Sequence, residues 1–134
     1  MKLYADEPGH DVVRELDAIA ISALARVEVP AALWRKHRDG ELDASATAVL
    51  TAVFERHYRG DRDHEARFGV VAAGPAVLDD AAARAAAHGL RAHDAVQLAS
   101  AISARTADPD CDAFACFDDE LRAAAGAVSF VLVP

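Results

Sequence analysis

Three acidic residues stand where the chain could build one chemically active site. Asp118 comes directly after the apolar segment Ala113–Phe117, and Glu28 follows the apolar run Ala18–Ile21. Asp94 lies at the expected start of a helix. In an open α/β sheet, groups just beyond the carboxyl ends of strands gather along one edge, where ligands bind. Glu28 and Asp118 follow this rule, whereas no clear strand precedes Asp94.

A cluster of three carboxylates would have a definite chemistry. Carboxylates within a few ångströms of one another repel, and each raises the pKa of its neighbours. Mg²⁺ or Mn²⁺ relieves that repulsion, because both ions prefer oxygen ligands. Such an ion acidifies a bound water and stabilises charge on a phosphate. One interpretation of the three acids is therefore a metal site able to act on a phosphate ester.

The alternative is that each acid serves only its own helix. Asp118 is a suitable N-cap, and Asp94–Gln97 matches a capping box; each would contribute about 0.5–2 kcal/mol. Glu28 is stronger evidence for a site, because it caps nothing and lies among Leu24, Val27 and Ala31. His93, beside Asp94, either tunes the site or is a partly exposed neighbour.

The elements that must position these acids alternate along the chain. Short apolar runs predict strands over Ala18–Ile21, Phe68–Val71, Ala113–Phe117 and Val128–Val133. Apolar residues at helical spacing, together with Gly and Pro punctuation, predict helices over Met1–Asp6, His10–Leu16, Ala23–Arg38, Ala44–Arg59, Pro75–Ala87, Asp94–Ala104 and Asp118–Ala125. This alternation predicts an α/β fold with a parallel sheet wrapped by helices.

Local signals refine the helix that carries Glu28. Ser22 is a suitable N-cap for the segment Ala23–Arg38. Pro30 lacks a backbone N–H and crowds the carbonyl of Arg26, so the sequence predicts a kink or a new helix start there. Trp34 of this helix, like Phe54 of the next, is a predicted core residue.

Composition narrows the class of protein. A chain of 134 residues with 53% apolar residues suits a single domain with a filled core. With 14 Lys and Arg against 22 Asp and Glu, the net charge of −8 excludes a bulk electrostatic binder of nucleic acid. Cys111 and Cys116 provide neither a disulfide framework nor a second pair for zinc. We expect a cytoplasmic protein without a membrane anchor, because the sequence has neither a long uncharged run nor a signal-peptide core.

Four segments, in order, carry a family resemblance: Lys2–Gly9, Ser22–Glu28, Leu90–Ala99 and Phe114–Leu121. They resemble parts of PIN-domain proteins, especially VapC-type toxins. The first resembles the end of the first helix of the family, and the others resemble the segments that carry its second, third and fourth acids. The likeness covers residues 1–134 as a single PIN-like domain.

The resemblance implies a function. It implies a PIN-like parallel sheet with an acidic groove, and cleavage of RNA phosphodiester bonds by a Mg²⁺- or Mn²⁺-activated water. Glu28, Asp94 and Asp118 would be the catalytic and metal-site acids, with Asp94 coordinating directly and Asp119 in a supporting role. The implied partners are an RNA substrate, a cognate antitoxin that covers the groove, and a second copy of the chain in a homodimer.

The sequence departs from the family at its start. Family members begin with a strand that ends in Asp, whereas here Met1 falls where the first helix is already under way. We therefore expect a PIN-like domain truncated at its N-terminus, with the first strand and first acid missing and with neighbouring strand edges exposed. Three interpretations stay open: a ribonuclease toxin whose true start lies upstream, a catalytically inactive PIN-like binding module that retains antitoxin or RNA binding, and another α/β phosphate-handling enzyme.

Overall fold

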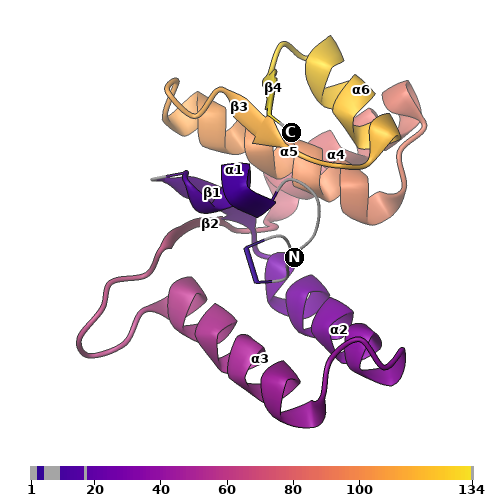
Figure 1. The fold of residues 1–134 in the computed structure, drawn as a ribbon. Coiled ribbons are helices and arrows are strands. Elements are labelled where there is room, and N and C mark those ends of the chain that lie inside the picture. The colour runs from indigo at the N-terminus through magenta and orange to yellow at the C-terminus, as the bar shows by residue number, and fades with distance from the viewer. Residues whose placement is uncertain (1–2, 5–9, 17, 134) are drawn as a thin grey trace. The chain divides into compact units, whose positions relative to one another are not determined.

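The structure, a computed structural model, describes residues 3–4, 10–16 and 18–133 and shows a mixed α/β chain (Figure 1). Its helices are α1 (His10–Arg14), α2 (Ala25–Arg38), α3 (Ala44–Arg59), α4 (Pro75–His88), α5 (Ala92–Ala107) and α6 (Asp119–Ala127). Its strands are β1 (Ile19–Ser22), β2 (Phe68–Val71), β3 (Ala113–Ala115) and β4 (Val131–Val133). None of the helices in these ranges is long and apolar enough to cross a membrane.

The predicted elements agree with the observed ones in type and order. The bounds of α3 and β2 are those predicted from the sequence. The last strand is shorter than predicted, because Val128 still caps α6 and Ser129 has a φ of 68°, which no strand residue adopts. The helix predicted over Met1–Asp6 falls largely outside the described residues.

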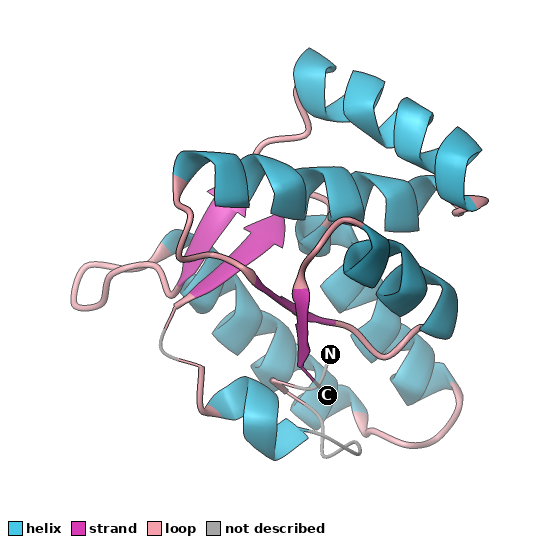
Figure 2. Cartoon of the chain, turned by 90° about the horizontal axis from the view of Figure 1, so that it is seen from above, coloured by secondary structure: helices cyan, strands magenta, loops and turns pink. Residues whose placement is uncertain are grey.

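The described strands form two small sheets rather than the one parallel sheet that the sequence predicts. β1 pairs with β2, and β3 pairs with β4 (Figure 2). β3 and β4 run parallel, with Ala113 opposite Val131 and Ala115 opposite Val133. The parallel direction is therefore confirmed for this pair.

The chain divides into two compact units. Unit 1 consists of Met1–Ile19 and Leu24–Gly69, and unit 2 consists of Ala20–Ala23 and Val70–Pro134. The divisions fall within β1 and β2. Of the helices, α1, α2 and α3 belong to unit 1, and α4, α5 and α6 belong to unit 2.

In unit 1, α2 packs against α3 around Leu33 and Phe54, both almost fully buried. The ring of Phe54 lies 5.9 Å from that of Tyr4 and 6.3 Å from that of Phe68. The core position predicted for Phe54 is confirmed, but that of Trp34 is wrong, since its side chain is 41% exposed. The reason is helical geometry: Leu33 takes the buried face, and the next residue is rotated by about 100°.

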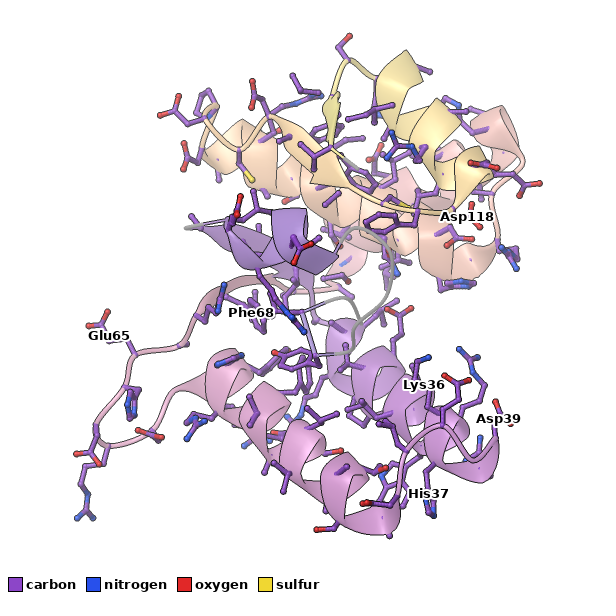
Figure 3. All side chains as sticks on the ribbon, viewed as in Figure 1. Lys36, His37, Asp39, Glu65, Phe68 and Asp118 are labelled. Carbon is purple, nitrogen blue, oxygen red and sulfur yellow. The ribbon has the colours of Figure 1, made fainter. Side chains whose placement is uncertain are left out.

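The turn between α2 and α3 and the start of α2 are fixed locally. Lys36 Nζ lies 2.6 Å from Glu41 Oε2, and a ring nitrogen of His37 meets the Leu42 carbonyl at 2.9 Å (Figure 3). The N-cap of α2 is Leu24, so the prediction that Ser22 caps this helix is wrong; Ser22 ends β1 and is buried. Pro30 starts no new helix, because α2 runs uninterrupted through it.

In unit 2, α5 is the central element and contacts both α4 and α6 (Figure 1). Its buried face includes Ala95, Leu98 and Ala99, and small alanines let helices approach closely. α4 ends at Gly89, whose φ of 68° is the left-handed conformation that favours glycine at a helix end. This turn leads at once into Arg91 and the start of α5. The start of α5 therefore follows closely on the end of α4.

Candidate acidic site

The start of α6 fixes one acid of the predicted set. Asp118 is the N-cap of α6, and its Oδ1 accepts a hydrogen bond from the Leu121 backbone N–H at 3.0 Å. The Asp118 N–H donates to Cys116 Sγ at 3.4 Å, which holds the turn after β3. The structure confirms the N-cap prediction and places Asp118 at the turn into α6 (Figure 3).

The start of α5 fixes the second acid, though not as predicted. The helix begins at Ala92 with Arg91 as its N-cap, so the capping-box interpretation of Asp94 is wrong. The helix starts early because Leu90, directly before Arg91, is buried and anchors the turn. Asp94 consequently lies in the first turn and is itself buried, with 6% of its surface exposed. A buried carboxylate needs charged or polar partners.

Arg91 brings these two acids together. Its Nε lies 3.3 Å from Asp94 Oδ2, and its Nη2 lies 3.2 Å from Asp118 Oδ2. His93 Nε2 lies 3.2 Å from the other oxygen of Asp94, Oδ1. Arg91 and Asp118 are 27 positions apart in sequence, so folding alone creates this cluster. We call Arg91, His93, Asp94 and Asp118 the acidic site.

The other two predicted acids, Glu28 and Asp119, lie at the starts of α2 and α6. Glu28 lies in the first turn of α2, in unit 1, whereas the acidic site lies in unit 2. A meeting of Glu28 with Asp94 and Asp118 therefore stays a prediction. Asp119 is the first residue of α6 and is exposed beside Asp118.

An open pocket of about 650 Å³ adjoins the site. Its walls come from one cation, one aromatic ring and three acids: Arg91, Phe117, Asp118, Asp119 and Glu120. Cys116 lies beside this site. Burial first, and then the negative charges of Asp118 and Asp94, raise the pKa of its thiol. Cys116 is thus a protonated thiol and a weak nucleophile.

The donor set can be tested against a divalent cation. Among the described residues, no group of three or more His, Cys, Asp and Glu side chains is arranged to hold a metal ion. Mg²⁺, however, is usually held by one or two carboxylates together with water and phosphate oxygens. Asp94 and Asp118 provide two carboxylates and so match that requirement in chemistry and number. Both also contact one cationic group, the guanidinium of Arg91.

No protein-family model matches the sequence, and no curated protein matches it either. What the acidic site can do therefore follows from its own residues. Arg91 is the residue that sequence reasoning missed. Its spacing of three from Asp94 at a helix start was a local signal, but its second partner, Asp118, lies too far along the chain for any pattern to indicate.

Proposed function

We propose that this protein is a Mg²⁺- or Mn²⁺-dependent endoribonuclease of the PIN-like, VapC-like type, the toxin of a toxin–antitoxin pair. The observation that carries the proposal is the convergence of Asp94 and Asp118, from the starts of two helices, on one cationic group beside an open pocket. Two converging carboxylates are a donor set suited to a divalent cation. The four segments that resemble PIN-domain proteins supply the substrate class, RNA.

The charge of the pocket supports a role for a metal ion. Three carboxylates and one guanidinium line it, so a phosphodiester would be repelled unless a cation offset the acids. When bound, Mg²⁺ or Mn²⁺ would acidify a water and stabilise the charge that builds on the phosphate. Asp94 and Asp118 would hold the ion, with Glu28 as a further ligand and Asp119 in a supporting role at the pocket wall.

The chain's own contacts orient these carboxylates. The Leu121 N–H fixes Oδ1 of Asp118, and His93 lies against Oδ1 of Asp94. The second oxygen of each acid, Oδ2, then faces the guanidinium of Arg91. Burial of Asp94 limits its rotation further. Preorganised carboxylates of this kind bind without having to reorder their side chains.

The partners proposed with this function are those that the resemblance implies. They are an RNA substrate, an antitoxin that covers the acidic site, and a second copy of the chain.

The test is cleavage of end-labelled, mixed-sequence RNA by the full chain with Mg²⁺ or Mn²⁺. Asp94→Asn and Asp118→Asn should each lower the rate by about 10²-fold, the usual loss when one preorganised charged contact to a transition state is removed. Glu28→Gln should also lower the rate. Asp112→Asn is the matched control, because it removes the same charge from an exposed position beside β3, and its rate should stay unchanged.

A second candidate function is favoured by Arg91. A guanidinium held between the two acids offsets one of their two negative charges without a metal ion, which would also suit a catalytically inactive PIN-like module. Such a module would bind antitoxin or RNA without cleaving it. Absence of metal-dependent cleavage, together with metal-independent binding of RNA, would favour this module over the enzyme.

A further inference from the structure

We infer that Arg91 is the resident counter-ion of the Asp94–Asp118 pair and competes with the divalent cation for it, so that Arg91 sets the metal concentration at which the site fills. This inference rests on the metal site in the proposed function and adds a means of regulation to it. The observation behind it is that Arg91 contacts one carboxylate oxygen of each of the two acids that would hold the ion.

All four carboxylate oxygens of the pair have a partner. Oδ1 of Asp118 accepts from the Leu121 N–H at 3.0 Å, and Oδ1 of Asp94 lies 3.2 Å from His93 Nε2. The two Oδ2 atoms both meet the guanidinium of Arg91, at 3.3 and 3.2 Å. Asp94 and Asp118 would therefore hold a divalent cation through their Oδ2 atoms only in competition with Arg91.

The side chain of Arg91 can move away from Asp94 and Asp118. Its side chain is 64% exposed, whereas that of Asp94 is 8% exposed, so the acid stays fixed while the arginine can move into water. Only Nε and Nη2 are engaged; within the part of the chain that the structure describes, Nη1 contacts no acceptor. The pair with Asp118, whose side chain is 37% exposed, is a surface ion pair, and such pairs are weak.

Arg122, on the same unit, shows the contrast. Its Nη1 donates to the backbone carbonyls of Cys116 and Val133 at 2.7 and 2.8 Å, which ties the end of β3 to the end of β4. Arg122 therefore has a structural role that cannot be given up without loosening the strands. Among the described residues, the side chain of Arg91, by contrast, bonds only to carboxylates, the groups that a divalent cation also seeks.

Removing Arg91 should strengthen metal binding. Without the guanidinium, the two Oδ2 atoms repel each other, and a divalent cation relieves that repulsion with no competitor to displace. A residue that merely shaped the site would give the opposite sign, since its loss would weaken binding. The sign of the change in affinity thus separates competition from support.

The experiment is calorimetric titration of the full chain with Mn²⁺, with no RNA present. Arg91→Gln should lower the dissociation constant by about tenfold, a typical coupling between two competing ligands. Arg84→Gln is the matched control: it removes the same charge from a half-buried pair with Asp80 in unit 2, away from Asp94 and Asp118, and it should change the constant by less than about twofold. Arg91→Lys, which keeps the charge but loses the fork that reaches both acids, should lie between wild type and Arg91→Gln.

The outcomes are distinguishable. If Mn²⁺ binds wild type and Arg91→Gln equally well, or binds the variant more weakly, the inference is overturned while the metal site stands. If Mn²⁺ binds neither, and Asp94→Asn changes nothing, the proposed metal site itself fails and the inference fails with it. Circular dichroism checks folding; should Arg91→Gln be unfolded, tighter Mn²⁺ binding by Arg91→Lys than by wild type supports the inference, and equal or weaker binding overturns it.

Discussion

Each unit contains a helix capped by an aspartate, and the two caps differ in what else they touch. In unit 1, Asp43 accepts a hydrogen bond from the Ala46 N–H at 2.7 Å at the start of α3. In unit 2, Asp118 makes the same bond to Leu121 and is also paired with Arg91. One residue type at one helix position is thus a cap in one region and a member of a charged cluster in the other. An acid at a helix start indicates a site only when a second charge from a distant segment meets it.

The packing of the two units differs in the same way. Unit 1 is organised by aromatic side chains, and ion pairs such as Lys36–Glu41 and Glu55–Arg59 join near neighbours on its surface. Unit 2 is organised by alanine-rich helices, which leave two helix starts close enough for one arginine to bridge. The Arg91–Asp118 pair of unit 2 therefore links separate elements, whereas these two pairs in unit 1 are local.

The largest effect that sharpens this comparison is expected at Phe54. Phe54→Ala should lower the free energy of unfolding by about 3–5 kcal/mol, because it opens a cavity among rings that Tyr4 and Phe68 line. Urea denaturation followed by circular dichroism measures it. Val49→Ala, at a position 58% exposed on the same helix, should change stability by less than about 0.5 kcal/mol. Equal losses in the two variants would contradict the aromatic core of unit 1.

Much of the secondary structure could be predicted because its signals are local. Helical spacing of apolar residues ends at Asp39–Gly40 and at Gly60, so α3 was predicted to the residue. Strand pairing could not be predicted in this way, because two strands of three or four residues carry no record of their partner. The split into β1–β2 and β3–β4 therefore emerged only from the structure.

For the acidic site, too, the local features could be predicted from the sequence and the long-range contacts could not. The N-cap role of Asp118 is a local property and was predicted correctly. The position of Asp94 within its helix was missed, since the buried Leu90 and the turn at Gly89 move the helix start to Ala92. The bridge through Arg91 depends on the packing of α5 against α6, which no spacing in the sequence encodes.

A smaller loss of stability is expected at the N-caps, and Mn²⁺ binding should distinguish Asp43 from Asp118. Asp43→Ala should cost about 0.5–2 kcal/mol of stability, while Asp43→Asn should cost almost nothing, because asparagine caps as well as aspartate. Asp118→Asn should likewise keep the cap on α6, yet it should weaken Mn²⁺ binding measured by calorimetry. Asp43→Asn is its matched control and should leave Mn²⁺ binding unchanged. Loss of Mn²⁺ affinity in both variants would show that net charge, rather than the acidic site, governs binding.

The smallest effect is expected from His57, whose charge state is coupled to the core of unit 1. His57 Nδ1 lies 2.9 Å from the hydroxyl of Tyr4, and its ring packs edge-on against Phe68. Burial, and then the positive charges of Arg67 and Arg56, lower the pKa of His57 from its usual 6.5. The unfolded chain therefore takes up a proton at a higher pH than the folded one.

The sign of the resulting pH dependence follows from that difference. The contribution of His57 to stability is fully present above pH 6.5 and is lost as the pH falls through the lowered pKa of the folded state. The urea midpoint of wild type should consequently fall between pH 7.5 and pH 5.5, and His57→Gln should show a shallower fall whatever its absolute stability. Val49→Ala, which alters an exposed apolar residue of the same helix and no titratable group, should keep the wild-type slope. An unchanged slope in His57→Gln would mean that other groups carry the pH dependence, and that the histidine beside Tyr4 is no more constrained than a surface residue.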